Sequence, residues 1–297
     1  MKNKMLVSAI ITTHNRLHLL KEAINSVRNQ TYSNIEILVV DDASTDGTKE
    51  YCEKLSDVRY LYISPSESLG ANHARNVGIE NSNGYYVAFL DDDDLWLPTK
   101  IEKQVEAMQM HLECDLCIGG FKEERIDNNK TLIYVPPYYT HQTELLDISK
   151  SCLYAGYAFT STMLIRKNVF SKTELFDENL QAYQEGELII RIAQLSKICR
   201  IYEPLIVYRV FCSDSQRISN RIFRWRLSMR YIYEKHKELY KSLTFREKLE
   251  VKHNYIAQAV ARSTASARTC LIFRYIIELR LCRLMIKITE ALGYQLK

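Results

Sequence analysis

Short apolar segments alternate with amphipathic patterns through the first 120 residues. The apolar segments, typical of buried strands, cover residues 5–11, 35–40, 58–63 and 85–90. Helical spacing follows at residues 17–30, 46–55 and 70–82, and Pro98 is placed to open a further helix. Strands rich in Val and Ile and joined by helices predict an α/β fold, with a mostly parallel sheet flanked by helices.

The pattern changes in the second half of the chain. One further helix is predicted at 185–196, among strands predicted at 116–121, 131–135, 161–166 and 205–211. From about residue 215 helical patterns dominate, and Gly and Pro are almost absent before Gly293. We therefore predict one α/β domain over residues 1–215 and a helical C-terminal extension over residues 216–297.

Three polar clusters follow predicted strands directly. They are TTHNR at 12–16, DDASTD at 41–46 and DDDD at 91–94. Because ligands of parallel sheets bind beyond the carboxyl ends of the strands, these clusters predict one carboxylate-rich site. Within the second cluster, Ser44 or Thr45 is expected to cap the next helix, which leaves Asp42 to accept a hydrogen bond from a nucleotide base or ribose.

The four consecutive aspartates are the strongest candidate for metal binding. Strand alternation predicts that Asp91 and Asp93 share one side while Asp92 points elsewhere. Carboxylate oxygens so placed can hold Mg²⁺ or Mn²⁺, with phosphate oxygens of a substrate completing the shell. The alternative is a solvated acidic loop or a helix cap, but the apolar residues on both sides argue against an exposed loop. Asp94 is expected to enter the next helix or to support the ligands.

Five segments resemble the family 2 inverting glycosyltransferases in order and spacing. They are residues 8–16, 29–48, 70–79, 85–100 and 176–192. The resemblance covers roughly residues 5 to 215 and implies the GT-A nucleotide-sugar-binding fold. It further implies sugar transfer from a nucleotide-sugar donor, for which we expect a UDP-sugar. The expected acceptor is a growing bacterial glycan of the O-antigen type or a lipid-linked saccharide.

The same resemblance implies roles for individual residues. Asp91 and Asp93 would bind Mn²⁺ or Mg²⁺, and Glu185, in the acidic motif at the start of its helix, would be the catalytic base. By itself, Glu185 reads as an ordinary acid at a helix start. The residues expected to bind the donor are Thr12, His14, Asn15, Arg16, Asp42, Arg75 and Asp92.

Some positions depart from the pattern of the family. Thr12 and His14 replace the usual Pro and Tyr of the first loop, which weakens the case for aromatic stacking on the base. Gly186 stands where many relatives carry an aromatic residue. Phe211 lies near the position of a histidine that helps to bind the metal in many relatives, so no ligand is expected there.

Charge is distributed unevenly along the chain. Residues 217–297 hold 18 Lys and Arg against 6 Asp and Glu, whereas residues 1–216 hold 22 against 30. The basic segments of the tail also carry an apolar helical face, which suits an anionic membrane surface. The alternative is that these helices pack on the catalytic domain or on a second subunit in a homo-oligomer. Nucleic acid is not expected as a partner, because the front of the chain is acidic and no reading motif accompanies the basic charge.

Cysteine usage and apolar run lengths predict a cytoplasmic location. The eight cysteines lack the spacing of a disulfide framework, and the lone Cys114-x-x-Cys117 pair has no second pair to complete a zinc site. The N-terminal apolar run is too short for a signal sequence, and no run of about 18 uncharged apolar residues occurs. If the tail binds lipid, the protein would be peripheral on the cytoplasmic face of the inner membrane.

Two other functions are compatible with the pattern. A sugar nucleotidyltransferase also uses a sheet-edge site and a divalent metal, but a glycine-rich basic loop for gripping phosphate is missing near the N-terminus. A catalytically degenerate GT-A protein with an assembly role is the second alternative, and Gly186 and Phe211 motivate it.

Overall fold

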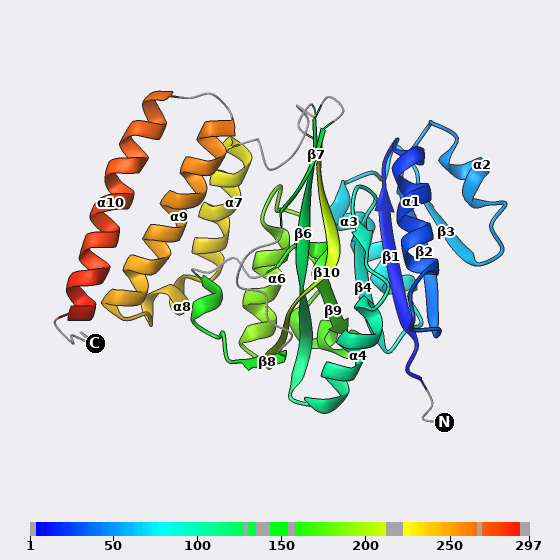
Figure 1. Cartoon of the computed structure of the whole chain (residues 1–297), viewed down its shortest axis with the longest axis horizontal. Helices are drawn as coiled ribbons and strands as arrows, with labels where there is room; N and C mark the ends of the chain where they lie inside the picture. Colours follow the sequence, from blue (N-terminus) through cyan, green and yellow to red (C-terminus); the bar gives the residue numbers. More distant parts are fainter. Residues whose placement is uncertain are drawn as a thin grey trace. The chain divides into compact units, whose positions relative to one another are not determined.

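The computed structural model describes residues 4–127, 130–134, 143–153, 158–211, 222–265 and 269–291. The chain forms two compact units (Figure 1). The first, called the sheet unit here, comprises residues 1–147, 158–178 and 191–213. The second, the helical unit, comprises residues 148–157, 179–190 and 214–297.

The N-terminal half of the sheet is parallel, with strand order β3-β2-β1-β4. Its strands are β1 (Val7–Thr13), β2 (Ile35–Asp42), β3 (Val58–Ile63) and β4 (Tyr86–Asp91). The helices between them are α1 (Leu17–Arg28), α2 (Thr48–Cys52) and α3 (Ala71–Asn81). Every residue of β1 is buried, which explains why this strand reads as a continuous apolar run rather than an alternating one.

The two faces of β1 are covered by different helices. Ile11 belongs to the same buried cluster as Leu20 and Ile24 of α1. On the opposite face α3 approaches so closely that a Cβ on Gly78 would lie 2.5 Å from Cγ2 of Ile10. Glycine is therefore the residue that lets α3 lie flat on the sheet and bring its own polar residues to the strand ends.

The other half of the sheet is mixed. It continues from β4 in the order β9-β6-β10-β5, in which β6 and β10 are parallel and β9 and β5 run antiparallel to their neighbours. The strands are β5 (Leu95–Trp96), β6 (Cys114–Asp127), β9 (Met163–Arg166) and β10 (Lys197–Phe211), with β7 (Lys130–Tyr134) on β6 and β8 (Thr143–Leu146) on β10. The remaining elements are the helices α4 (Lys100–Met110) and α5 (Phe170–Thr173) and the 3₁₀ turns η1 (Ser151–Leu153), η2 (Thr160–Thr162) and η3 (Lys167–Val169). The predicted fold class, a sheet flanked by helices and followed by C-terminal helices, is confirmed.

The helical unit has a core of its own. Its helices are α6 (Gln184–Ala193, whose last turn belongs to the sheet unit), α7 (Ile222–Lys235), α8 (Lys237–Lys241), α9 (Phe245–Ala265) and α10 (Thr269–Ala291). Trp225 of α7 is fully buried and stacks on Tyr255 of α9, with 4.9 Å between ring centroids. Ile256, Tyr275 and Cys282 belong to the same cluster. Among the described residues, no helix is both long and apolar enough to cross a bilayer.

Two helix starts differ from the predictions. Neither Ser44 nor Thr45 caps α2, because the chain makes one further turn through Gly47, whose φ is 86°, before the helix begins at Thr48. The Ser44 hydroxyl instead accepts a hydrogen bond from the backbone of Asn15. Helix α4 begins at Lys100, two residues beyond Pro98.

Lys100, the first residue of α4, is fully buried. Its Nζ donates a hydrogen bond to Oε1 of Gln104 at 2.8 Å and lies 4.2 Å from the ring centroid of Trp96. Burial lowers the pKa of the Lys100 ammonium to about 7. An unfolded chain has the ordinary, higher lysine pKa, so the unfolded state binds the proton more tightly above pH 7.

We expect Lys100→Met to change how stability depends on pH. Because the folded-state pKa is lowered, protonation favours unfolding as pH falls toward 7. The free energy of unfolding of the wild type relative to Lys100→Met should therefore rise by ~1.4 kcal/mol per pH unit between pH about 7 and about 9. Urea unfolding across that range measures it. Lys54→Met, at an exposed position, controls for the loss of a charge, and a pH-independent difference for Lys100→Met would contradict the expectation.

Candidate active site

The three polar clusters lie together at one edge of the sheet. The parallel register places Thr13 of β1 beside Asp41 of β2, and Thr12 beside Asp91 of β4. Both central strands therefore end at the same level, and the loops that follow them meet. This convergence follows from the parallel pairing that the apolar pattern predicted.

The loops after β1 and β2 are joined by hydrogen bonds between backbone groups of one loop and side chains of the other. The backbone N–H of Asn15 donates to Oγ of Ser44, and the backbone N–H of Thr45 donates to Oδ1 of Asn15, both at 2.8 Å. A ring nitrogen of His14 bonds to the backbone carbonyl of Asp42. Asn15 has a φ of 53°, a left-handed conformation that asparagine tolerates better than most residues. The two loops therefore form one rigid wall of the site.

Two buried polar atoms beside this wall have no hydrogen-bond partner. They are Oδ1 of Asp42, an acceptor, and Nε of Arg75, a donor. The guanidinium of Arg75 otherwise donates to Oδ1 of Asp91 at 2.6 Å and to Oδ1 of Asn72 at 3.3 Å. Because buried polar groups are normally hydrogen-bonded, an unpaired acceptor and an unpaired donor at the strand ends are suited to a polar ligand.

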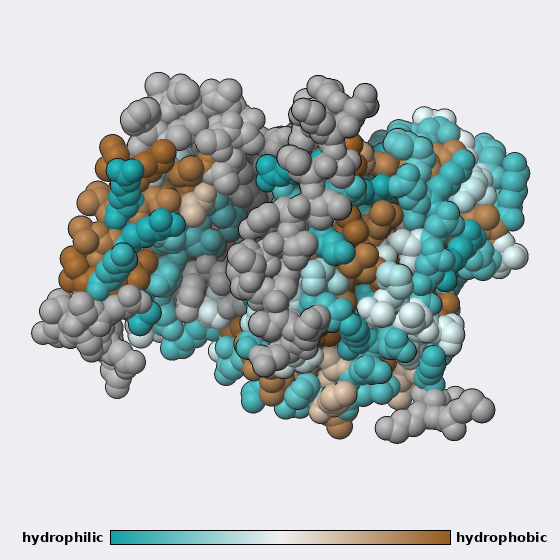
Figure 2. Space-filling view, viewed as in Figure 1, coloured by the Kyte–Doolittle hydropathy of each residue, from teal (hydrophilic) through white to brown (hydrophobic). Residues whose placement is uncertain are grey.

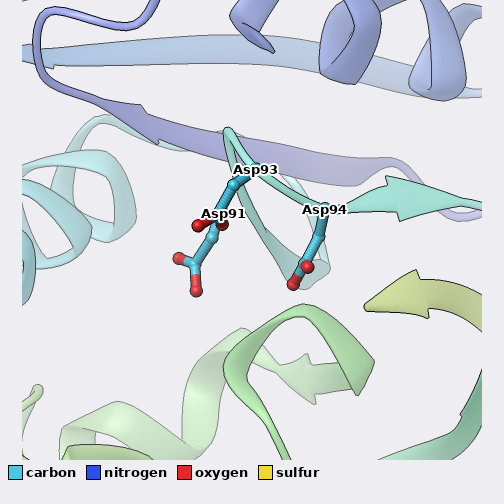
Figure 3. Close-up of side chains that lie close together, drawn as sticks. All are labelled: Asp91, Asp93 and Asp94. Carbon is cyan, nitrogen blue, oxygen red and sulfur yellow. The ribbon is translucent and has the colours of Figure 1, made fainter. Parts of the chain in front are cut away.

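The four aspartates form a tight turn rather than a continued strand. Strand β4 ends at Asp91, and the backbone N–H of Asp94 donates to the carbonyl of Asp91 at 3.0 Å. One carboxylate oxygen each of Asp91, Asp93 and Asp94 lies within 4.8 Å of the others. Figure 3 shows these three carboxylates pointing to the same side of the turn. Strand alternation does not apply beyond Asp91, and the turn adds Asp94 to the pair expected from the sequence.

Asp92 points away from this group. Its Oδ2 accepts a hydrogen bond from the Thr13 hydroxyl at 2.7 Å, and its Oδ1 lies 3.3 Å from Nη1 of Arg16. The same guanidinium nitrogen lies 3.2 Å from Oδ2 of Asp93. Burial and then the neighbouring charge of Asp93 raise the pKa of Asp92 to about 7, against the lowering effect of Arg16. Asp92 therefore links the loop after β1 to the acidic turn.

Asp94 is held from the opposite half of the sheet. Its side chain is fully buried and accepts hydrogen bonds from the Ser161 hydroxyl at 2.6 Å and from the backbone N–H of Arg209 at 3.1 Å. Burial, and then the charges of Asp93 and Asp91, raise the pKa of the Asp94 carboxyl well above its ordinary value. It does not enter a helix, because α4 begins six residues later. Burial first, and the neighbouring carboxylates second, disfavour the ionised forms of Asp92 and Asp94, and a cation among them would stabilise those forms.

Arg209 of β10 is a site residue that the sequence reasoning did not assign. Its Nε donates to the backbone carbonyl of Asp93 at 2.6 Å, and its guanidinium also pairs with Glu22 of α1. The side chain is 6% exposed, whereas that of Glu22 is 55% exposed. A charged residue in an otherwise apolar strand segment was the signal that could have identified it.

Glu185, the predicted catalytic base, lies in the first turn of α6 and belongs to the helical unit. The neighbouring Glu187 is completely buried, with Nζ of Lys235 and Nε2 of His236 each 3.0 Å from its Oε1. These contacts attach the start of α6 to the end of α7. The acidic turn belongs to the sheet unit, so the role of Glu185 stays a prediction from the motif.

The departures from the family pattern also have structural explanations. A Cβ on Gly186 would overlap the ring of Tyr183, which has a φ of 61°. The ring of Tyr183 thus lies beside Gly186, the position at which many relatives carry an aromatic residue. The ring of Phe211 lies 5.8 Å from the guanidinium carbon of Arg209 and offers no metal ligand.

The acidic turn lies beyond the carboxyl ends of the parallel strands, where open α/β sheets bind ligands, and the mixed sheet flanked by helices is the GT-A nucleotide-sugar-binding fold. The chain belongs to glycosyl transferase family 2: the sequence model of the family described as "Glycosyl transferase family 2" matches residues 8–172. An uncharacterized glycosyltransferase of Rickettsia typhi is 35% identical over 206 residues, which cover 69% of this chain and 64% of that protein. An uncharacterized glycosyltransferase of Haemophilus influenzae is 29% identical over 238 residues, covering 74% and 70%.

A further relative and a solved structure extend the comparison. The Bacillus subtilis protein provisionally named teichuronic acid biosynthesis glycosyltransferase TuaG is 34% identical over 154 residues, covering 50% of this chain and 61% of that protein. The fold resembles that of Staphylococcus aureus TarS residues 1–349 in complex with UDP-GlcNAc, with a TM-score of 0.61, 17% identity and coverage of 97% and 92%. The chain spans less than two thirds of the length of the Rickettsia relatives that it matches.

We expect substitutions of Arg209 and of Glu22, which form an ion pair, to lower the free energy of unfolding by different amounts. Arg209→Lys keeps the charge but loses the Nε–H group that donates to the carbonyl of Asp93, so it should lower the free energy of unfolding by ~2 kcal/mol. Glu22→Gln removes an exposed partner and should lower it by less than about 1 kcal/mol. Urea unfolding of both variants measures the difference. Equal losses would show that Arg209 acts through Glu22 rather than through the acidic turn.

Proposed function

We propose that this chain transfers a sugar, with inversion, from a UDP-sugar to a hydroxyl of a glycan or lipid-linked acceptor, with a divalent metal. The observation that carries the proposal is that the unpaired Asp42 and Arg75 atoms and the acidic turn lie at the same edge of the sheet, in a chain of this family. A structure of similar fold was solved with UDP-GlcNAc, which supports a UDP-sugar as the donor.

The wall formed by the first two loops supports a nucleoside site. Uracil carries an imide N–H, and the buried Oδ1 of Asp42 is an acceptor without a partner. In the proposal, Thr12, His14, Asn15 and Arg16 line the nucleoside pocket with Asp42. Asp92 accepts a hydrogen bond from the ribose, and the free Nε of Arg75 donates to the diphosphate or to the sugar.

The acidic turn fits a hard divalent cation. Three carboxylates with ligand atoms within 4.8 Å of one another provide the oxygen donors that Mg²⁺ and Mn²⁺ prefer. Asp91 and Asp93 would hold the ion, with Asp94 beside them. A cation bound there stabilises the negative charge that develops on the departing diphosphate. The raised pKa of Asp94 supports the assignment, because crowded and buried carboxylates are most stable with a positive charge among them.

Glu185 is assigned as the base of the transfer step. Its carboxylate takes the proton of the acceptor hydroxyl as that oxygen forms a bond to the anomeric carbon. The bond from the anomeric carbon to the diphosphate oxygen breaks on the opposite face, so UDP leaves and the configuration inverts. The burial of Glu187 against Lys235 and His236 supports this role, since it fixes the turn of α6 that carries Glu185.

The acceptor is proposed to belong to a bacterial surface polymer. The name of TuaG places that relative in teichuronic acid biosynthesis, which supports a glycan acceptor for the present chain. In this proposal residues 1–215, including α6, are the catalytic domain and residues 216–297 are its helical extension. The reaction is proposed to take place at the cytoplasmic face of the inner membrane, where lipid-linked saccharides are presented.

A screen of nucleotide sugars tests the reaction class. Incubation with UDP-sugars and Mn²⁺ should release UDP, and chelation of the metal should stop the release. Incubation with nucleoside triphosphates and sugar phosphates should release no pyrophosphate, whereas pyrophosphate release would favour a sugar nucleotidyltransferase. Failure to bind UDP with Mn²⁺ at millimolar concentration in calorimetry would favour the degenerate assembly protein.

We expect Asp42→Asn to weaken UDP binding. The substitution replaces a charged acceptor by an amide, and hydrogen bonds to charged groups contribute ~1.5–3 kcal/mol, so the dissociation constant should rise by about tenfold or more. Titration calorimetry with UDP and Mn²⁺ measures the change. Asp57→Asn, at a surface carboxylate that pairs with Arg28, serves as the control and should bind UDP as the wild type does. Unchanged affinity in Asp42→Asn would remove Asp42 from the donor site.

Asp93→Ala and Glu185→Gln should both abolish transfer, for different reasons. Asp93→Ala should weaken Mn²⁺ binding, measured by electron paramagnetic resonance of the free ion. Glu185→Gln should bind Mn²⁺ and UDP normally but lower UDP release from the preferred donor by about 100-fold or more, because the base is lost. Circular dichroism checks that both variants fold. Turnover like that of the wild type in either variant would contradict the role assigned to that residue.

A further inference from the structure

Helix α10 carries two apolar faces, of which one is buried. Tyr275, Cys282 and Ile286 are almost fully covered, and the first two belong to the core of the helical unit. This inner face packs mainly against α9. One apolar face is enough to hold a helix on a protein core, so the second face calls for another explanation.

The second face, called the outer stripe here, is a row of four aliphatic side chains. They are exposed to 58%, 56%, 55% and 47%, respectively, at Ile277, Leu281, Leu284 and Ile288. Spacings of four, three and four residues place them along one side of the helix, opposite the inner face. Figure 2 shows apolar side chains gathered over α10. A contiguous exposed row of this kind marks an interaction surface rather than a set of scattered exposed residues.

A row of basic side chains runs along one flank of the outer stripe. Arg280, Arg283 and Lys287 are all exposed and recur at intervals of three and four residues. Arg283 also contacts His253 of α9, with 3.0 Å between Nε and Nε2. Arg280 lies at the middle of α10, and Lys287 lies near its C-terminal end. The chain from residue 217 onward carries a net charge of +12, so its wider field is positive as well.

The charge of this flank argues against an antiparallel second copy as the occupant. Two copies packed stripe to stripe and antiparallel would bring the same flank of each helix together, placing Arg280 and Lys287 beside their equivalents. Such like-charge contacts are unfavourable. An anionic surface, by contrast, satisfies the apolar stripe and the basic flank at the same time. Charged residues within α10 are compatible with a helix that lies on the surface of a bilayer. None of the described helices is long and apolar enough to span one.

We propose that the outer stripe and basic flank of α10 dock this chain on a bilayer that contains anionic phospholipid. The stripe inserts among the acyl chains near the headgroups, and the flank neutralises lipid phosphates. The inner face meanwhile stays on α9, so the helix does not have to leave the protein to bind. This surface is separate from the residues proposed for sugar transfer, and it does not depend on that function.

Co-sedimentation of the full chain with vesicles tests the proposal. The wild type should sediment with vesicles of phosphatidylcholine mixed with phosphatidylglycerol, and much less with phosphatidylcholine alone. Raised salt should weaken the binding. Leu281→Asp/Leu284→Asp should abolish it. Arg280→Gln/Lys287→Gln should weaken it by about tenfold or more, because each basic residue near an anionic surface contributes about a fivefold change in affinity.

A matched control uses two apolar residues that are more exposed than the stripe. Met110→Asp/Leu112→Asp changes side chains that are each 75% exposed on the sheet unit, and it should leave vesicle binding unchanged. Thermal melts followed by circular dichroism check the folding of each variant. Binding by Leu281→Asp/Leu284→Asp equal to that of the wild type would overturn the proposal, as would equal binding to neutral and anionic vesicles. A vesicle-free dimer that this variant dissociates, seen by sedimentation velocity, would identify a second copy as the occupant instead.

Discussion

The repulsion among four adjacent carboxylates at the end of β4 is the constraint on which the site depends. Asp94 is fully buried, and its pKa is raised well above the ordinary value, so the turn is stable only where surrounding groups support it. That support comes from both halves of the sheet. Arg16 and Arg75 approach from the parallel half, and Arg209 holds the turn from β10. The acidic turn is therefore one of the points at which the two halves of the sheet are joined by polar contacts.

The arrangement separates structural and ligand-facing roles within a single short segment. Asp92 and Asp94 accept hydrogen bonds from the hydroxyl groups of Thr13 and Ser161, which keep the turn in place, and the proposal gives Asp92 the donor ribose as a second partner. Asp91 and Asp93 are less buried and can present oxygen atoms to a cation, although each also faces an arginine. Positive side chains beside a candidate metal site limit its net negative charge, which suits a site that must also admit a diphosphate.

The helical unit combines packing and recognition in one helix. Its buried cluster, which includes Trp225, gives the basic tail a hydrophobic core of its own, in a unit that also contains Glu185. The outer stripe of α10 remains exposed because the inner face already satisfies the packing of the helix on α9. An enzyme whose acceptor is embedded in or attached to a membrane would gain from such a surface, because adsorption confines the search for the acceptor to two dimensions.

The sequence by itself determined the α/β class, the parallel strands of the first half and the convergence of three polar clusters. These features follow from the spacing of apolar residues and from the residues at the strand ends, and both can be recognised in short stretches of sequence. The sequence also placed Asp91 and Asp93 in one candidate site. The tertiary structure alone decided that Asp94 turns back beside them and that Arg209, more than 100 residues later, holds the turn. It also decided that Gly47 rather than Ser44 precedes α2. These features depend on where the chain turns and on which strands become neighbours, and neither is encoded in the local pattern of apolar and polar residues.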